Sequence, residues 1–317
     1  MMKERIVILG AGESGTGTAL LAKAKGFEVF VSDKGQIGEG YKSQLIAAGI
    51  DFEEGQHSED KILNAKEIVK SPGIPLTAPL VVKALEMQIP IIDELEFASR
   101  FTKARFIGIT GSNGKTTTTL LTYHLMQKCR FNVGLAGNIG QSLAKQVIED
   151  NFDWYVLEIS SFQLDGMFTF RNAIAILTNI TPDHLDRYSY KLENYVASKF
   201  RITRNMEKAD VLIVSSEDPI VFAEIGRRNP SSRLVSVGLE AGQDNPIFKH
   251  NDSLIFNHIQ PSFDISTRML PLTGDHNMLN AMMAVAAVSQ AGGNPELIRE
   301  GIKDFVNAPH RCEFVTN

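Results

Sequence analysis

Short apolar runs alternate with helical stretches along the chain, and a polar or glycine-rich cluster follows each run. Runs of this length, rich in Ile, Val and Phe and separated by helical segments, are typical of strands in a parallel sheet. The strands predicted in this way cover residues 6–9, 28–32, 67–70, 89–92, 106–110, 132–135, 154–157, 174–177 and 211–214. Open parallel sheets bind ligands at the carboxyl ends of their strands, so we expect the polar clusters to converge there.

The first run ends in Gly10-Ala-Gly12-Glu-Ser14-Gly15, a helical stretch over 18–25 follows, and Asp33 ends the second run. Glycines in a strand-to-helix turn let the backbone approach a phosphate, and the helix N-terminus favours negative charge. An acidic residue after the next strand completes the dinucleotide-binding pattern. A tight turn without a ligand is the alternative.

A rigid loop, Ser71-Pro-Gly-Ile-Pro75, follows the run 67–70, and Asp93-Glu94 follows the run 89–92. Two prolines and a glycine favour a simple turn when the loop is considered alone. If the strands are parallel, however, Gly73 faces the same crevice as Gly12 and Asp33.

A second glycine loop is the stronger signal. The run 106–110 leads into Gly111-Ser-Asn-Gly114-Lys115-Thr116-Thr117 and then a helix. Lysine at this place reaches terminal phosphates and the following threonine hydroxyl binds Mg²⁺, which predicts an ATP site. The general pattern has a further glycine at the position of Ile109, so this is a shorter form of the loop.

Three later residues are candidates for chemistry. Glu158 directly follows an apolar run and would be costly to bury without a cation, although a water-exposed strand end is an equal alternative. His184 lies between Asp183 and Asp186 and could bind metal or phosphate, or be a solvated loop residue. Lys199 lies in a helix predicted over 193–205, where a solvated face is the ordinary interpretation.

Composition excludes several classes. Apolar residues are 43% and charged residues 22% of 317, which argues against a disordered or fibrous protein. A net charge of −5 without like-charge blocks gives no indication of nucleic-acid or membrane binding. Two cysteines, Cys129 and Cys312, cannot form a disulfide framework and fit a reducing compartment, so we expect a cytoplasmic protein.

These segments resemble the Mur ligase superfamily, ATP-dependent amide-forming enzymes of peptidoglycan synthesis, from Gly10 to Arg311. The resemblance is carried by Val69-Lys-Ser-Pro-Gly-Ile74, Gly137-Asn-Ile-Gly140, Leu157-Glu-Ile-Ser-Ser-Phe-Gln-Leu164 and Asp183-His-Leu-Asp-Arg-Tyr188. Within the superfamily, Ser-Ser-Phe-Gln-Leu is similar to the members that add D-glutamate to UDP-N-acetylmuramoyl-L-alanine. The implied fold is α/β, with a Rossmann-like N-terminal domain and a central domain of the P-loop ATPase type on a mostly parallel sheet.

The resemblance reassigns the first glycine loop from NAD to the UDP end of the substrate. The UDP-substrate residues that it implies are Gly12, Ser14, Asp33, Gly73, Asn138, Ser160 and Gln163. Thr273-Gly-Asp-His-Asn-Met-Leu-Asn280 is similar to a helix start that lies near adenine, and Pro309-His-Arg311 to a segment that contacts the nucleotide ribose. The implied ATP-binding residues are Gly111, Ser112, Asn113, Gly114, Lys115, Thr116, Thr117, Asn277, Asn280 and Arg311.

The implied cofactors are ATP and Mg²⁺, with Thr116, Glu158, His184 and a carbamylated Lys199 as metal ligands. The implied catalytic residues are Lys115, Glu158, His184 and Lys199. ATP would phosphorylate the alanyl carboxylate, and the D-glutamate amine would attack the acyl phosphate.

We expect a UDP-substrate-binding domain over 1–93, an ATP-binding domain over 94–307 and a linker over 308–317. The family continues with a third domain that receives D-glutamate, so we expect a monomeric fragment that binds UDP-substrate and is inactive alone. Three alternatives remain open: an NAD-dependent dehydrogenase, a nucleotide-regulated binding module, and a folate polyglutamate synthase, which should lack the UDP-binding domain.

Overall fold

The computed structural model describes residues 4–242, 245–257, 259 and 261–307. These residues form two compact units. The first unit comprises the described residues up to Lys103 together with Gly140–Asn151 and Ser161–Phe170. The second comprises Ala104–Ile139, Phe152–Ser160 and the described residues from Arg171 onward. Arg311, which the resemblance assigned to the nucleotide ribose, lies outside the described residues.

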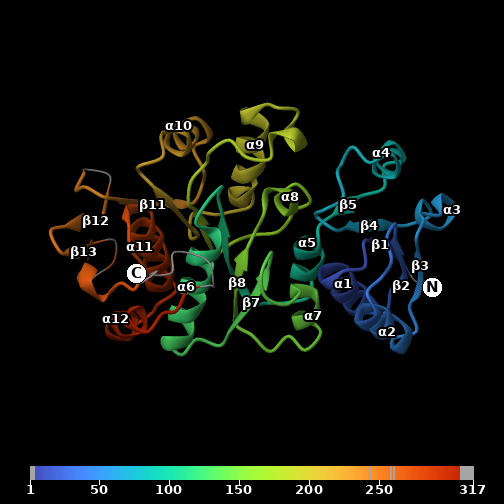
Figure 1. Cartoon of the computed structure of the whole chain (residues 1–317), viewed down its shortest axis with the longest axis horizontal. Helices are drawn as coiled ribbons and strands as arrows, with labels where there is room; N and C mark the ends of the chain where they lie inside the picture. Colours follow the sequence, from blue (N-terminus) through green and yellow to red (C-terminus); the bar gives the residue numbers. More distant parts are fainter. Residues whose placement is uncertain (1–3, 243–244, 258, 260, 308–317) are drawn as a thin grey trace, which may run out of the picture. The chain divides into compact units, whose positions relative to one another are not determined.

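The first unit is built on a five-stranded parallel sheet with the order β3-β2-β1-β4-β5 (Figure 1). Its strands are β1 (Arg5–Leu9), β2 (Glu28–Asp33), β3 (Asp51–Glu54), β4 (Glu67–Lys70) and β5 (Ile91–Ile92). Its helices are α1 (Glu13–Ala24), α2 (Glu39–Ala47), α3 (Glu59–Ile62), α4 (Pro79–Glu86), α5 (Glu94–Ser99), α7 (Leu143–Val147) and α8 (Ser161–Leu164). The chain leaves β1 on one side towards β2 and later returns to β4 on the other, which makes the end of β1 the switch point where such sheets bind ligands.

Buried acids on α5 hold the two later segments in this unit. The Glu94 carboxylate accepts hydrogen bonds from Ser142 Oγ at 2.5 Å and from the Ala144 amide at 3.0 Å. Glu96 is fully buried and accepts from the backbone amides of residues 168–170 at 2.9–3.1 Å. A buried carboxylate is stable only when hydrogen-bonded, so these donors account for two charged side chains inside the unit.

The second unit contains a nine-stranded sheet with the order β14-β13-β12-β11-β10-β9-β6-β8-β7. Its strands are β6 (Arg105–Thr110), β7 (Val133–Gly137), β8 (Trp154–Glu158), β9 (Ile174–Leu177), β10 (Val211–Ser215), β11 (Arg233–Gly238), β12 (Ile247–His250), β13 (Ser253–Phe256) and β14 (Phe263–Ser266). The pairs from β7 to β12 are parallel, while β13 is antiparallel to both β12 and β14. The predicted α/β fold with a mostly parallel sheet is therefore confirmed.

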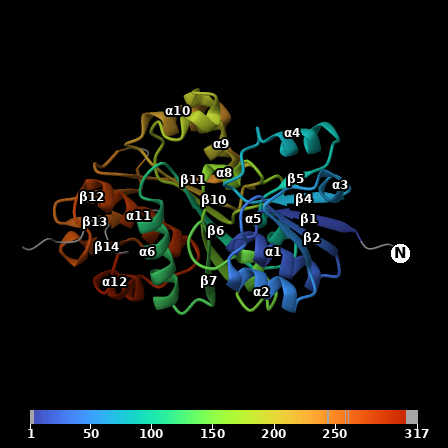
Figure 2. The same cartoon turned by 45° about the vertical axis from the view of Figure 1, so that its right-hand side comes forward.

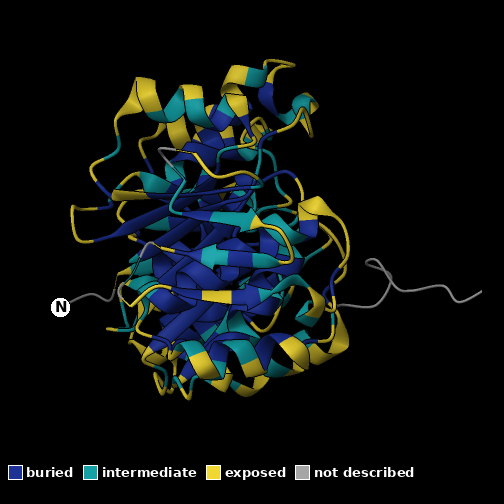
Figure 3. Ribbon diagram, turned by 90° about the vertical axis from the view of Figure 1, so that its left-hand side faces the viewer, coloured by how far each residue is buried: buried dark blue, intermediate teal, exposed yellow. Residues whose placement is uncertain are grey.

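Helices α6 (Lys115–Lys128) and α11 (Asp275–Gln290) pack side by side against this sheet, as Figures 1 and 2 show. Strands β8, β9 and β10 are buried along their whole length, β12 to β14 are only partly buried, and the helices turn their exposed residues outward (Figure 3). The remaining helices are α9 (Leu192–Lys199), α10 (Pro219–Arg228) and α12 (Pro295–Lys303), with short 3₁₀ turns at Leu185–Tyr188, Phe200–Thr203 and Thr267–Met269. Among the described residues, no helix combines the length and apolar character needed to cross a membrane.

The helix predicted over 193–205 is wrong in its second half. The α-helix ends at Lys199 and continues as a 3₁₀ turn over Phe200–Thr203. The solvated face expected of Lys199 is also wrong, because this side chain is only 2% exposed. Tyr195, Phe200 and Ile202 are also buried, as their amphipathic spacing predicted.

Candidate active site

The loop between β6 and α6 has the strand-to-helix geometry expected of a phosphate-binding loop. Gly114 precedes the helix with a φ of 79°, a left-handed conformation that favours glycine. A Cβ at Gly111 would lie 1.8 Å from Thr178 Oγ1, so a side chain has no room there. Lys115 Nζ donates to the carbonyls of Gly111 and Ser112, both at 2.9 Å. The predicted lysine therefore lies directly over the loop.

The loop is fastened to the segment that follows β9. The Ser112 amide donates to Asn179 O and the Asn113 amide to Asn179 Oδ1, each at 2.9 Å. The Ser112 hydroxyl lies 2.9 Å from Thr181 O and 3.1 Å from the Tyr195 hydroxyl. In this structure the amides of Ser112 and Asn113 therefore bond within the protein and not towards a phosphate, which differs from the simple cradle that the glycine pattern predicts.

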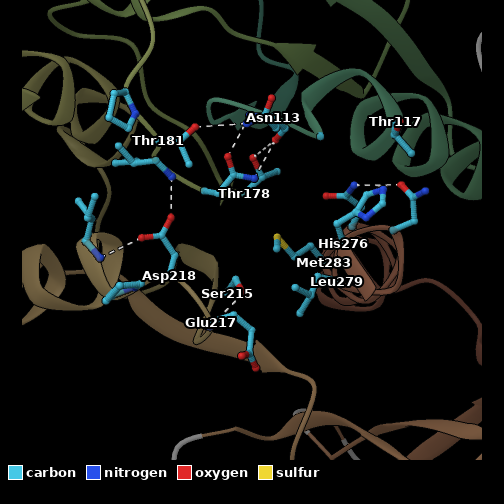
Figure 4. Close-up of a pocket in the computed structure, with 18 residues that line it drawn as sticks. Asn113, Thr117, Thr178, Thr181, Ser215, Glu217, Asp218, His276, Leu279 and Met283 are labelled. Carbon is cyan, nitrogen blue, oxygen red and sulfur yellow. Dashed lines mark hydrogen bonds between the residues drawn. The ribbon is translucent and has the colours of Figure 1, made fainter. Parts of the chain in front are cut away.

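A cavity of about 740 Å³ adjoins this loop (Figure 4). It lies between the loop, the segment after β9, the end of β10 and the start of α11. Asn277 and Asn280 on α11 line it, as predicted, and Asn280 also packs against Gly114. The full lining is Asn113, Gly114, Thr117, Thr178, Asn179, Ile180, Thr181, Pro182, Ser215, Glu217, Asp218, Pro219, Ile220, His276, Asn277, Leu279, Asn280 and Met283.

Three charged or titratable residues of this cavity were not predicted: Glu217, Asp218 and His276. Asp218 accepts from the Ile180 amide at 2.6 Å and caps α10 through the amides of Ile220 and Val221. Its role is to join the segment after β9 to the end of β10. The polar cluster after the run 211–214 was visible in the sequence, but nothing in its residue types distinguished it from an ordinary loop.

Glu158 at the end of β8 is 1% exposed. It lies between β6 and β7, opposite Ile109 and Gly137. Asn138 Nδ2 donates to its Oε1 at 2.7 Å, while Oε2 is buried and has no hydrogen-bond partner among the described residues. Ile109, the pairing partner of Glu158, lies two residues before Gly111 of the phosphate loop. A buried carboxylate with one oxygen unpartnered among the described residues fits a bound cation such as Mg²⁺. The alternative of a water-exposed Glu158 is wrong.

Lys199 reaches the phosphate loop from α9. Its Nζ donates to Gly111 O at 2.8 Å, the same carbonyl that Lys115 contacts, and lies 4.6 Å from the centre of the Tyr195 ring. Thr116 follows Lys115 at the start of α6 and is partly exposed. The buried position of Lys199 beside the loop fits a functional lysine far better than a solvated one.

His184 differs from the other candidates because it is exposed. It has a φ of 49°, its side chain is 56% exposed, and Nε2 lies 3.5 Å from the Asp183 carboxylate. Within the described part of the chain, no three His, Cys, Asp or Glu side chains gather closely enough to form a metal site by themselves. The structure thus brings Glu158, Lys199 and the phosphate loop together through the sheet, without placing His184 against Glu158.

The first unit has a separate cavity of about 700 Å³ at its switch point. Gly12, Asp33 and Gly73 line it, as predicted, together with His57 and residues after β4. The full lining is Gly10, Gly12, Asp33, Lys34, Gly55, Gln56, His57, Glu59, Ser71, Gly73, Ile74, Pro75, Ala78, Pro79 and Leu80. The Ser71–Pro75 loop is therefore a wall of the cavity as well as a turn.

The three glycines of this turn have different steric roles, although the motif treats them alike. Gly10 has a φ of 92°, and a Cβ there would lie 2.4 Å from Ser71 Oγ. Gly15 would place a Cβ 1.8 Å from Gly10 O, whereas Gly12 faces open space. Asp33 accepts from the Ala11 amide at 2.7 Å and the Gly35 amide at 2.8 Å, so it fixes the turn to β2.

Four residues assigned to the UDP-substrate do not line this cavity: Ser14, Asn138, Ser160 and Gln163. Ser14 forms a hydrogen bond with the buried Glu94, and Asn138 holds Glu158. Gln163 is buried on α8, and Ser160 is half-buried.

Known proteins share both units. Residues 109–288 match the Mur ligase middle domain, and residues 4–93 match the N-terminal domain described as Mur ligase MurD-like. A UDP-N-acetylmuramoylalanine--D-glutamate ligase of Bacteroides fragilis is 48% identical over 313 residues, 98% of this chain and 70% of the relative. The enzyme of the same name from Porphyromonas gingivalis is 49% identical over 317 residues, 99% of this chain and 70% of the relative.

Solved structures show the same fold at lower identity. One is the UDP-N-acetylmuramate:L-alanyl-gamma-D-glutamyl-meso-diaminopimelate ligase from Neisseria meningitides, with a TM-score of 0.65 at 20% identity. The match covers 96% of this chain and 99% of the solved chain. A UDP-N-acetylmuramate-alanine ligase from Thermotoga maritima has a TM-score of 0.57 at 22% identity, covering 97% of this chain and 69% of its own.

A nucleotide-binding α/β protein with a lysine-bearing phosphate loop is the class that the fold and the site define. Within that class the chain belongs to the Mur ligase family, and it is an ATP-dependent ligase of peptidoglycan synthesis. The matches give no support to a dehydrogenase or to a binding module without transfer chemistry.

Proposed function

We propose that this protein joins D-glutamate to UDP-N-acetylmuramoyl-L-alanine at the expense of ATP. The relatives named above support the choice of substrates. The observation that carries the site is Glu158, a buried carboxylate with one unpartnered oxygen next to the phosphate loop. In this proposal the uridine end of the substrate binds in the cavity of the first unit and ATP in the cavity of the second.

In this proposal the chain's own residues position and neutralise phosphate. Lys115 releases the carbonyls that it contacts and turns to the terminal phosphates of ATP, while Asn277 and Asn280 contact the adenine. Asn138 holds the Glu158 carboxylate with Oε2 directed to a cation. When bound, Mg²⁺ would neutralise charge on the transferring phosphoryl group. Thr116, Glu158, His184 and Lys199 remain the proposed metal-site residues.

The reaction itself balances as two transfers. The alanyl carboxylate oxygen attacks the terminal phosphorus of ATP, and ADP leaves. The amine of D-glutamate then attacks the carbonyl carbon of the acyl phosphate, loses a proton and expels inorganic phosphate. Charge builds up on phosphoryl oxygens in both steps, which is where a fixed lysine contributes most.

We also propose that Lys199 is carbamylated in the active protein. Carbamylation would turn a cation into an anion able to hold the metal, and its buried position beside Gly111 favours such a role. NMR of the protein incubated with isotope-labelled bicarbonate tests this. We expect a carbamate signal from the unmodified protein and none from Lys199→Ala. A monomeric state and a cytoplasmic location complete the proposal.

Binding measurements test the substrate assignment directly. Titration calorimetry with UDP-N-acetylmuramoyl-L-alanine should show binding that UDP competes with and that ATP analogues do not displace. NADH serves as the control ligand. Binding of NADH without binding of either uridine compound would refute the proposal. In a protein that also carries the family's third domain, phosphate release should depend on the D-isomer, with L-glutamate as the matched control.

A further inference from the structure

A hydrogen-bonded chain of three side chains in the first unit has no role in the proposal so far. His57, which follows β3, lines the 700 Å³ cavity. Its Nδ1 lies 2.7 Å from Ser32 Oγ, and Ser32 is fully buried. Ser32 Oγ lies 2.7 Å from Glu53 Oε1, an oxygen that also accepts from the Ser58 amide at 2.7 Å. These hydrogen bonds link the buried side chains of Ser32 and Glu53 to His57 at the cavity wall.

The protons in this chain can be counted. Burial alone would raise the pKa of Glu53, but hydrogen bonds from Ser58 and Ser32, with Lys61 nearby, lower it below its usual value. An ionised carboxylate only accepts hydrogen bonds, so the single hydroxyl proton of Ser32 is directed to Glu53. Ser32 Oγ then offers only lone pairs to His57. His57 Nδ1 must therefore carry a hydrogen and donate it.

The hydrogen on Nδ1 also determines the protonation state of the other ring nitrogen, Nε2. Burial lowers the pKa of His57, against the opposing effect of Glu53 and Asp33, so the ring is neutral at pH 7. A neutral imidazole with hydrogen on Nδ1 has a bare lone pair on Nε2. Among the described residues, Nε2 has no hydrogen-bond partner, and it points away from Ser32 because it lies across the ring from Nδ1. His57 thus offers the cavity a fixed acceptor.

The position of His57 in the cavity suits the base of a nucleotide. Gly10 and Gly12 form the turn at the end of β1, where a pyrophosphate approaches the backbone, and Asp33 lies beyond it at the end of β2. His57 lies one strand further out, after β3. Pro79 and Leu80 provide an apolar wall for a flat ring.

We propose that His57 Nε2 accepts a hydrogen bond from the imide N–H of the uracil ring and so makes the first unit specific for uridine nucleotides. This inference rests on the proposed placement of the UDP-substrate in this cavity. Uracil carries a donor at its ring nitrogen N3, whereas cytosine carries an acceptor there. A fixed acceptor on the protein therefore favours uracil and opposes cytosine with its lone pair.

Titration with UDP and CDP tests the role of His57. We expect the 317-residue chain to bind UDP at least about tenfold more tightly than CDP, because the mismatch leaves two acceptors facing each other. His57→Ala should lower UDP affinity about three- to tenfold and leave CDP affinity nearly unchanged, since a single hydrogen bond is lost. Ser32→Ala should also reduce the preference, because the tautomer is no longer fixed. Ser43→Ala, at an exposed serine of α2 outside the cavity lining, is the matched control and should keep it.

Folding of the first unit in each variant is checked by thermal unfolding and limited proteolysis, because ATP-analogue binding involves only the second unit, which shares no residue with this cavity. A UDP to CDP preference that survives in both His57→Ala and Ser32→Ala overturns the role of His57, as does equal binding of UDP and CDP by the unmodified chain. If the unmodified chain binds UDP-N-acetylmuramoyl-L-alanine but free UDP does not compete, the placement of the uridine fails, and the inference fails with it.

Discussion

Replacing Glu158 with Gln should abolish stabilisation by Mg²⁺ without unfolding the protein. The substitution keeps the shape of the side chain and the acceptor that Asn138 Nδ2 contacts at 2.7 Å, but it removes the charge from the unpartnered oxygen. The assay is thermal unfolding of the second unit with a constant concentration of a non-hydrolysable ATP analogue, with and without Mg²⁺.

The size of the effect follows from linkage. An ion at 100 times its Kd stabilises the native state by about 2.7 kcal/mol. At roughly 2–4 °C per kcal/mol for a unit of this size, this raises Tm by about 5–11 °C. Removing one partner of a buried charge pair costs about 3–5 kcal/mol, so the same Mg²⁺ concentration would then contribute only about 0.3 kcal/mol, or near 1 °C.

Asn138 provides an intermediate case. Asn138→Ala leaves the carboxylate but releases its orientation, and loss of such a supporting hydrogen bond weakens metal affinity about 10- to 100-fold. At a 30-fold loss the Mg²⁺ contribution would be about 0.9 kcal/mol, or about 2–4 °C. Glu240→Gln, an exposed carboxylate in the same unit, is the control and should keep the full shift. A full Mg²⁺ shift in Glu158→Gln would remove Glu158 from the metal site.

Four further predictions concern pH, sterics and the buried lysine. Burial raises the pKa of Asp93 well above its usual value, so the folded state loses stability as pH rises through that range. Asp93→Asn keeps the helix cap, and its free energy of unfolding relative to that of the unmodified chain should increase from pH 4 to pH 7; a pH-independent difference would contradict this. Protonation of His57 would place a hydrogen on Nε2, so the UDP to CDP preference should fall as pH is lowered through the range where the ring protonates; a preference that persists while NMR shows the ring protonated would argue against the acceptor. Gly10→Ala should weaken UDP binding about tenfold or more while Gly12→Ala changes it little, since only Gly10 has positive φ and a blocked Cβ position; equal effects would refute the steric division. Lys199→Ala, made in a protein that also carries the family's third domain, should abolish ligation and be rescued in part by short carboxylic acids, and unimpaired activity would exclude Lys199 from the site.

The sequence was most informative where local pattern and tertiary role agree. Every strand predicted from an apolar run lies in one of the two sheets, and the two glycine loops border the two cavities. The apolar run before Glu158 predicted a strand end, but its burial depends on β6 and β7 on either side of it. Lys199 shows the same limit, because only the fold reveals that its helix places the ammonium group at Gly111 O.

Hydrogen bonds between residues that are distant in sequence could not be predicted from the sequence. The pattern around Gly111 predicts phosphate contacts, yet Asn179 takes the amides of Ser112 and Asn113. His57 carried no signal because its environment is formed by Ser32 and Glu53 from two other strands. The dinucleotide pattern likewise gave Gly12 and Gly15 equal weight, although only the latter is sterically required.

The two segments that return to the first unit have a consequence for how this chain is made. Glu94 and Glu96 find their donors at Ser142, Ala144 and residues 168–170, far along the chain from the sheet that they complete. A ribosome therefore has to release the chain as far as Phe170 before the first unit can close around these carboxylates. A gene fragment ending at residue 93 or 103 would contain the five-stranded sheet with its α5 acids absent or without the donors at residues 142–144 and 168–170. The unit that comes first in the sequence should thus reach its final stability only after part of the second unit has also been made.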